Sequence, residues 1–154
     1  MRKRTQHTTF GFTLIEILLV IALIAILASI VIVAINPGKQ LEKARDAQRQ
    51  SDVLAIMNAV YQYATDNGGT FPGNLSSAEY EICRTGEEDC TDLYDFSDLT
   101  DDQLYLVSIP LDPLCDTPNG DCADNGVGYY ISKTASGRVE ITGNGEGVVI
   151  DIVR

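Results

Sequence analysis

Residues 12–35 form an almost uninterrupted apolar run, and no other feature constrains the fold of this chain as strongly. Only Thr13, Glu16 and Ser29 are polar within it. As an α-helix the run would be about 36 Å long, which is enough to cross the hydrocarbon core of a membrane. Three of the first four residues are basic, so the leader is expected on the cytoplasmic side. We therefore predict a single-pass anchor in the cytoplasmic membrane, with the remainder of the chain outside.

Two details argue against an ordinary secretory signal peptide or a plain anchor. The cleavage site of a signal peptide lies among small residues after its apolar stretch, whereas Asn-Pro-Gly-Lys follows here at 36–39. Glu16 also lies inside the apolar run, where a carboxylate costs about 2.5–3.5 kcal/mol at the membrane centre and less near the interface. A charge in this position usually has a partner.

The motif Gly11-Phe12-Thr13-Leu14-Ile15-Glu16, between a basic leader and the apolar run, resembles the class III signal of type IV pilins and pseudopilins. The resemblance implies that a prepilin peptidase cuts between Gly11 and Phe12 and methylates the new amino terminus of Phe12. That terminus stays cationic, since an α-amino group has a pKa of about 7.7–8.0. In a filament, Glu16 could pair with the Phe12 terminus of a neighbouring subunit and so set the axial register.

A second helical segment is predicted after a break at Asn36-Pro37-Gly38, because proline removes a helical hydrogen bond. An apolar stripe follows at helical spacing, with a gap at 45–52, and predicts a face that packs on a core. The stripe consists of Leu41, Ala44, Val53, Ile56, Met57, Val60 and Ala64. A mixed-charge, solvated face is predicted for Glu42, Lys43, Arg45, Asp46, Arg49 and Asp52. Asn67-Gly68-Gly69 is a strong helix stop.

Four cysteines, Cys83, Cys90, Cys115 and Cys122, lie in a region rich in acidic residues and glycine. An even number of cysteines in an exported domain indicates two disulfides. Three pairings are possible, and loop entropy favours Cys83 with Cys90 and Cys115 with Cys122. A zinc site is disfavoured because six residues separate each pair, where zinc sites have two to four.

Oxygen-bearing side chains also gather near the second cysteine pair. The candidate calcium ligands are Asp112, Asp116, Asn119, Asp121 and Asp124. Hard oxygen ligands in a glycine-rich loop suit calcium, and some pseudopilins hold calcium in a comparable loop. The spacing does not match an EF-hand, and Asp, Asn and Gly also occur in loops because they form turns. The prediction for cofactors is therefore none, with calcium as the open alternative.

Three runs at 127–133, 138–142 and 148–153 predict an antiparallel meander, with turns at Ser136-Gly137 and Asn144-Gly145. Residues 79–102 carry ten acids and one base, and predict an exposed loop with short helical turns. The expected fold is α+β and pilin-like, with a long N-terminal helix packed on a small C-terminal antiparallel sheet. The expected segments are a cleaved leader (1–11), a transmembrane and filament-core half-helix (12–36), an amphipathic half-helix (37–69) and a globular head (70–154).

Composition limits the functions that remain. A net charge of −11 argues against nucleic acid as a partner, and His7 is the sole histidine, so histidine-based catalysis is not expected. We predict a non-enzymatic subunit of a type IV pilus-like filament at the cell surface. Its expected partners are other copies of the chain in a helical filament, the prepilin peptidase, a membrane assembly platform and, before assembly, lipid.

Two alternatives remain open at this point. The first is a pseudopilin of a type II secretion or competence system. The Pro-Leu-Asp-Pro step at 110–113 and Tyr129-Tyr130 resemble major pseudopilins, but Leu114-Cys115 stands where that family usually has Trp-Gly. The second is a monomeric, membrane-anchored domain that binds calcium or another ligand, in which Glu16 would have no role.

Overall fold

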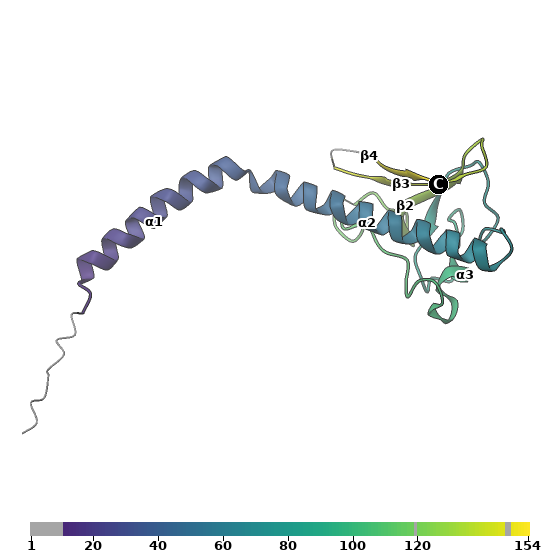
Figure 1. Cartoon of the computed structure of the whole chain (residues 1–154), viewed down its shortest axis with the longest axis horizontal. Helices are drawn as coiled ribbons and strands as arrows, with labels where there is room; N and C mark the ends of the chain where they lie inside the picture. The colour runs from purple at the N-terminus through teal and green to yellow at the C-terminus, as the bar shows by residue number, and fades with distance from the viewer. Residues whose placement is uncertain (1–10, 119, 147–148) are drawn as a thin grey trace, which may run out of the picture. The chain divides into compact units, whose positions relative to one another are not determined.

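A computed structural model describes residues 11–118, 120–146 and 149–154 of the chain (Figure 1). The chain forms two compact units, residues 1–40 and residues 41–154. The leader at 1–10 and the candidate ligand Asn119 lie outside the described residues.

The first unit is built around helix α1, Leu14–Ile35. Its most apolar 18-residue window has a mean hydropathy of 3.4, and none of the 22 residues of the helix is buried. Its length is about 33 Å, as expected for a helix that crosses a membrane. Because no side chain of α1 packs on a core, its fold is specified by local propensity and by the apolar surroundings that its composition requires.

The break expected at 36–38 is present, and Asn36 forms it. Asn36 has a left-handed backbone conformation (φ 47°) and ends α1, a conformation that asparagine adopts more readily than most residues. Its side-chain Oδ1 accepts a hydrogen bond from the backbone N–H of Lys39 at 3.4 Å. The next helix, α2 (Pro37–Asp66), begins directly at Pro37, and proline is favoured at the first helical position. One asparagine therefore ends one helix and caps the next.

The globular unit contains a four-stranded antiparallel sheet in the order β1-β2-β3-β4. Its strands are β1 (Tyr80–Cys83), β2 (Gly126–Lys133), β3 (Val139–Asn144) and β4 (Val149–Val153). Strands β2, β3 and β4 form the predicted meander. Helix α2 lies against this sheet (Figure 1), so the expected α+β, pilin-like fold is confirmed.

Strand β1 was not predicted, since it lies in the acidic stretch at 79–102 that the sequence predicts to be a loop. It pairs with β2 through an irregular register between Glu81 and Cys83. Glu81, Ile82 and Cys83 are buried in succession, so this four-residue strand lacks the alternation of exposed and buried residues that would reveal it in the sequence. The short helical turns expected in the same stretch are α3 (Ser97–Thr100) and a 3₁₀ turn, η1 (Asp101–Gln103).

The core joins α2 to the sheet through Val53, Ile56, Met57 and Val60, and these four residues of the predicted stripe are buried. Leu41 and Ala44 of that stripe are exposed, and the exposed fraction of Leu41 is 60%. The predicted solvated face is also wrong at Arg49 and Asp52, which are buried. Arg49 lies four residues before Val53, and Asp52 lies four residues before Ile56, so they share the same face of the helix. The core-facing side of α2 therefore starts with charged residues.

Candidate functional site

The segment from Gly11 to Glu16 combines an extended backbone with the start of α1. Residues 11–13 are not helical, and α1 begins at Leu14. Thr13 is the N-cap, and its hydroxyl accepts a hydrogen bond from the backbone N–H of Glu16 at 3.3 Å. This is the usual cap geometry for threonine. The Gly11–Phe12 peptide bond is thus exposed, outside the helix and next to a well-defined helix start.

The fold itself does not require glycine at position 11. A Cβ atom built there would have no heavy atom of the described residues within 4 Å. Steric contact with the described residues therefore does not explain this glycine. Recognition of the segment by another protein would explain it.

Glu16 is the single acidic residue of α1 and lies in its first turn. A carboxylate near a helix N-terminus is favoured by the helix dipole, but that benefit is well below the cost of a charge in lipid. Among the described residues no basic group forms an ion pair with Glu16. The described part of the chain thus supplies no counter-charge to this carboxylate.

Comparison with known proteins places these features in context. The chain is 42% identical over 67 residues to type II secretion system core protein G of Aeromonas hydrophila, a match that covers 44% of this chain and 43% of that protein. It is 44% identical over 57 residues to the protein of the same name from Escherichia coli K12, which covers 37% and 38%. The resemblance to the pilin and pseudopilin family is confirmed. The matches span less than half the length of these relatives, no family model matches the chain, and no solved structure matches it.

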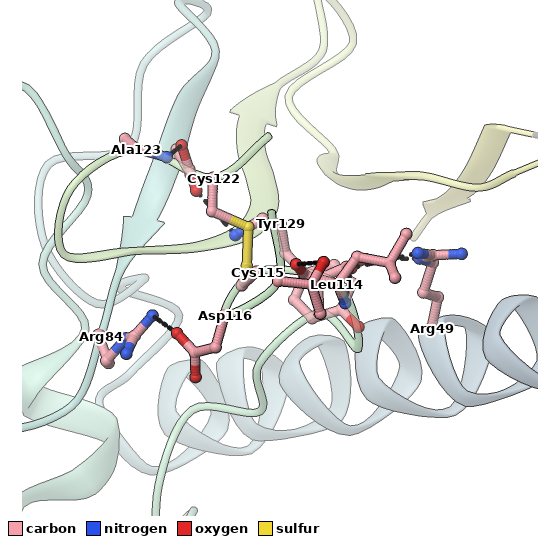
Figure 2. Close-up of a disulfide and its surroundings, with 12 residues drawn as sticks. Arg49, Arg84, Leu114, Cys115, Asp116, Cys122, Ala123 and Tyr129 are labelled. Carbon is pink, nitrogen blue, oxygen red and sulfur yellow. Dashed lines mark hydrogen bonds and ion pairs between the residues drawn. A yellow bond between two sulfur atoms is a disulfide. The ribbon is translucent and has the colours of Figure 1, made fainter. Parts of the chain in front are cut away.

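The globular unit of the chain carries two disulfides, Cys83–Cys90 and Cys115–Cys122. These are the pairs that short loop closure favours. Their Cα atoms are 5.7 Å and 5.3 Å apart, within the ordinary range for a disulfide. Figure 2 shows the Cys115–Cys122 disulfide with Leu114 and Asp116 beside it in the chain. The first disulfide begins at the end of strand β1 and the second lies close to strand β2.

Glu81 on strand β1 is a buried carboxylate that sequence reasoning missed. Its Oε2 accepts the backbone N–H of Ala123 at 3.0 Å, and its Oε1 accepts that of Gly128 at 2.7 Å. Glu81 thereby fixes the chain on both sides of the turn that leads from Cys122 into strand β2. At Gly128 (φ 79°) an added Cβ atom would lie 2.7 Å from the sulfur of Cys122 and 2.8 Å from the Cβ of Asp112, so only glycine fits there.

The structure does not bring the candidate calcium ligands together as one set. Asp112 is buried and forms an ion pair with Arg49, whereas Asp116 is exposed and pairs with Arg84 at 3.1 Å (Figure 2). Asp124 is exposed at a turn, and Asp121 lines a cavity of about 90 Å³ together with Asp112. In the described part of the chain no group of three acidic, histidine or cysteine side chains is placed to hold a metal. Calcium binding at this loop stays a prediction.

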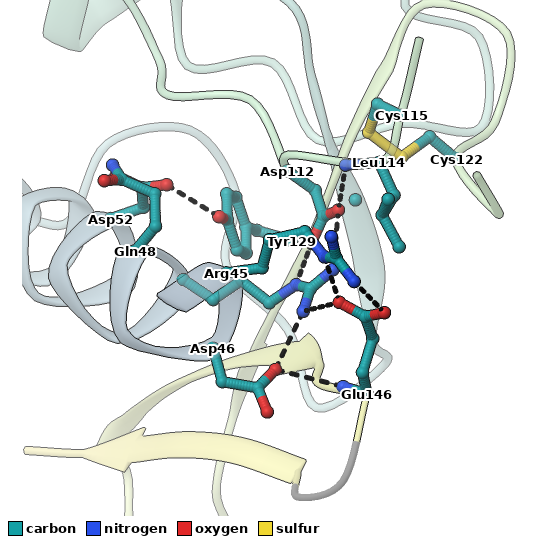
Figure 3. A network of polar contacts seen from close by, with 12 residues as sticks. Arg45, Asp46, Gln48, Asp52, Asp112, Leu114, Cys115, Cys122, Tyr129 and Glu146 are labelled. Atoms are coloured by element: carbon teal, nitrogen blue, oxygen red, sulfur yellow. Dashed lines mark hydrogen bonds and ion pairs between the residues drawn. A yellow bond between two sulfur atoms is a disulfide. The ribbon is translucent and has the colours of Figure 1, made fainter. Parts of the chain in front are cut away.

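A polar cluster that includes Asp112 joins α2 to two later segments of the chain (Figure 3). We call it the Arg49 cluster: Arg45, Asp46, Arg49, Asp112 and Glu146. Arg49 is only 1% exposed, and its hydrogen bond to Asp112 raises the pKa of the guanidinium, which keeps it charged. Because these partners are up to 101 residues apart in the sequence, no local pattern indicates them. The gap at 45–52 in the apolar stripe was the one available signal.

Next to this cluster, Asp52 accepts two hydrogen bonds. Gln48 Nε2 donates to Oδ1 and the hydroxyl of Tyr129 donates to Oδ2, each at 2.8 Å. Burial and the hydrogen bond to Asp52 raise the pKa of Tyr129, so the phenol stays protonated and remains a donor. Tyr129 on strand β2, inside the sheet, thus donates a hydrogen bond to the buried Asp52 carboxylate on α2.

Proposed function

We propose that this chain is a filament subunit of a type II secretion system, held in the cytoplasmic membrane by α1 until it is assembled. The observation that carries the proposal is α1 itself, an apolar helix with every side chain exposed and one carboxylate in its first turn. An apolar surface of this length needs lipid or other apolar helices around it. The matched relatives are named as type II secretion core proteins. These names support a role as a secretion-system subunit better than a role as a pilus subunit.

In this proposal the prepilin peptidase cuts the extended Gly11–Phe12 bond and methylates the amino group of Phe12. Cleavage removes the basic leader and keeps α1 as the anchor. The new cationic terminus lies about one helical turn from Glu16. When subunits associate, the Glu16 carboxylate of one chain pairs with the Phe12 terminus of its neighbour, which offsets the cost of two charges in an apolar filament core.

The role is structural and not enzymatic, in line with relatives that are named as core proteins of a machine. The proposed partners are further copies of the chain in a helical filament, the prepilin peptidase, the assembly platform and, before assembly, membrane lipid. The globular unit would face the space outside the cytoplasmic membrane, where disulfides persist.

Two measurements test the proposal. Mass spectrometry of the mature protein should find an N-methylated Phe12 terminus, and Gly11→Leu should leave the leader attached, with Gly11→Ala as the milder control. Deletion of the gene should then leave the secreted enzymes of the cell trapped outside the cytoplasmic membrane. An intact Met1 terminus in assembled filaments would refute the processing step. Normal secretion with loss of surface pili would return the function to a pilus subunit.

A monomeric membrane-anchored binding domain remains the alternative of another class. Chemical cross-linking in intact cells separates the two, because a filament subunit gives a ladder of multimers and an anchored monomer does not.

A further inference from the structure

Three carboxylates from three separate segments converge on the guanidinium of Arg49. Figure 3 labels the three acidic residues, Asp46, Asp112 and Glu146. Asp46 lies one turn earlier on α2, Asp112 lies in the loop before the second disulfide, and Glu146 lies between β3 and β4. Arg49 Nη1 is 2.8 Å from Asp46 and 3.5 Å from Glu146. Arg49 Nε and Nη2 both donate to the carboxylate of Asp112. One cation thus links the helix to two segments that follow it by 63 and 97 residues.

The contacts use most of the hydrogen-bonding capacity of this cluster. Asp112 accepts both guanidinium donors, and its Oδ1 also accepts the backbone N–H of Leu114 at 2.8 Å. Asp46 accepts the backbone N–H of Glu146 at 3.0 Å, and Glu146 pairs in addition with Arg45. A planar guanidinium with five donors suits such a set, because it can contact several carboxylates at once in fixed directions.

The same acidic groups would otherwise favour a metal ion. The cavity of about 90 Å³ beside Arg49 is also lined by Asp112, Asp121 and Glu146. Calcium binds six to eight oxygen atoms at about 2.3–2.6 Å. Here both oxygens of Asp112 are already occupied by the guanidinium, and the side chain of Arg49 reaches the centre of the acidic group.

We propose that Arg49 is the resident cation of this acidic cavity, and that it holds the Asp112 loop and Glu146 on α2 so that the globular unit is stable without a divalent cation. The proposal does not depend on the function proposed above, since it concerns the folding of one chain. It also explains why a charged residue lies on the core-facing side of α2, one turn before Val53.

The test is the thermal unfolding of the full chain in detergent micelles, followed by near-ultraviolet circular dichroism, in EDTA and in millimolar calcium chloride. We expect the wild-type melting temperature to be the same in both solutions. Arg49→Met should lower it by about 10 °C or more, because one partner of a buried ion pair is lost. Arg138→Met, which removes an exposed arginine, is the matched control and should have little effect.

The effect of calcium on the melting temperature separates the wild type from Arg49→Met more sharply than the melting temperature alone. In Arg49→Met the three carboxylates face a larger cavity without a counter-charge, so calcium should raise the melting temperature of this variant and not that of the wild type. Arg49→Lys keeps the charge and loses the forked contact with Asp112, so it should melt lower and stay insensitive to calcium. If Arg49→Met does not fold, the comparison of Arg49→Lys with the wild type provides the test. A calcium-dependent rise for the wild-type protein, or Arg49→Met or Arg49→Lys melting at the wild-type temperature, would overturn the proposal.

Discussion

Helix α1 exposes its apolar side chains, whereas the globular unit buries charged ones. Every residue of α1 is accessible, including large aliphatic side chains along its whole length, and its one carboxylate has no described partner. In the globular unit, Arg49, Asp52, Glu81 and Asp112 are buried, and each has a hydrogen-bond partner within the chain. Both regions break the ordinary rule that apolar residues are inside and charges outside.

The difference shows where each region obtains its stabilisation. Buried charges are tolerated when they are paired and hydrogen-bonded, and the globular unit supplies those partners itself. The apolar surface of α1 and its carboxylate need partners that the described residues of the chain do not supply. Substitutions in α1 should therefore change association, and substitutions in the globular unit should change folding.

Glu16→Ala should give the largest effect, and it should appear only in association. The substitution leaves the cationic Phe12 terminus of a neighbouring subunit unpaired, a change that costs about 3–5 kcal/mol for a buried pair. We expect few or no filaments, with processing and membrane level close to normal. The measurement is a filament count by electron microscopy beside an immunoblot of the mature membrane protein. Ser29→Ala is the control, since Ser29 donates to Ile26 within its own helix. Normal filaments from Glu16→Ala protein would show that the carboxylate of α1 needs no partner from a neighbouring subunit.

Gly128→Ala should give the largest of these stability effects in the globular unit. The added methyl group meets Cys122 and Asp112 at less than 3 Å, and the residue has a positive φ. A loss of about 2–4 kcal/mol in the free energy of unfolding is expected from overpacking and backbone strain. Gly137→Ala has a similar φ but nothing closer than 3.9 Å, so it should cost about 1 kcal/mol. Equal costs in chemical denaturation would contradict the tight packing around Asp112.

Tyr129→Phe tests whether a buried carboxylate needs its internal partner. The substitution removes the hydroxyl that donates to Asp52 and keeps the ring in the core. Loss of a hydrogen bond to a buried charged group is expected to cost about 1–3 kcal/mol. Tyr130→Phe on the same strand is the control, because Tyr130 is less buried. The two variants should differ in chemical denaturation of the full chain, and equal stabilities would count against the role of Asp52.

The smallest expected effect is on the pH dependence of stability. It comes from Arg45 and Glu146, at the partly exposed end of the Arg49 cluster. The hydrogen bond from Arg45 holds the pKa of Glu146 below its usual value. Because the folded pKa is lower than the unfolded one, this pair stabilises the fold above the ordinary glutamate pKa, and the benefit disappears as the pH falls through the lowered value. Glu146→Gln should therefore flatten the decrease in melting temperature between about pH 6 and pH 3. Salt should have a similar flattening effect, since the pair is partly exposed. An unchanged pH profile in Glu146→Gln protein would exclude this contribution.

Much of the fold could be predicted because its signals are local. The meander of β2, β3 and β4 follows from alternating runs and glycine-containing turns, and the break at Asn36-Pro37 follows from the missing proline donor. Strand β1 could not be predicted in the same way, since four residues contain too little alternation. The strand forms because Glu81 pairs with Tyr130 on β2 and Ile82 forms a bridge with Tyr94.

Helix α1 could be predicted from the sequence alone, because its length and apolar composition are properties of one continuous segment. A bilayer or a bundle of apolar helices accepts such a segment without further requirements. The sequence also indicated Gly11, Phe12 and Glu16, which lie at fixed spacing within six residues. The burial of Arg49 and Asp52, in contrast, depends on the folded arrangement of the chain. Their positions on α2 look solvated in the sequence. Asp112, which pairs with Arg49, and Tyr129, which donates a hydrogen bond to Asp52, lie 63 and 77 residues away. A charge can be buried only where such partners converge, and that convergence is a property of the folded chain.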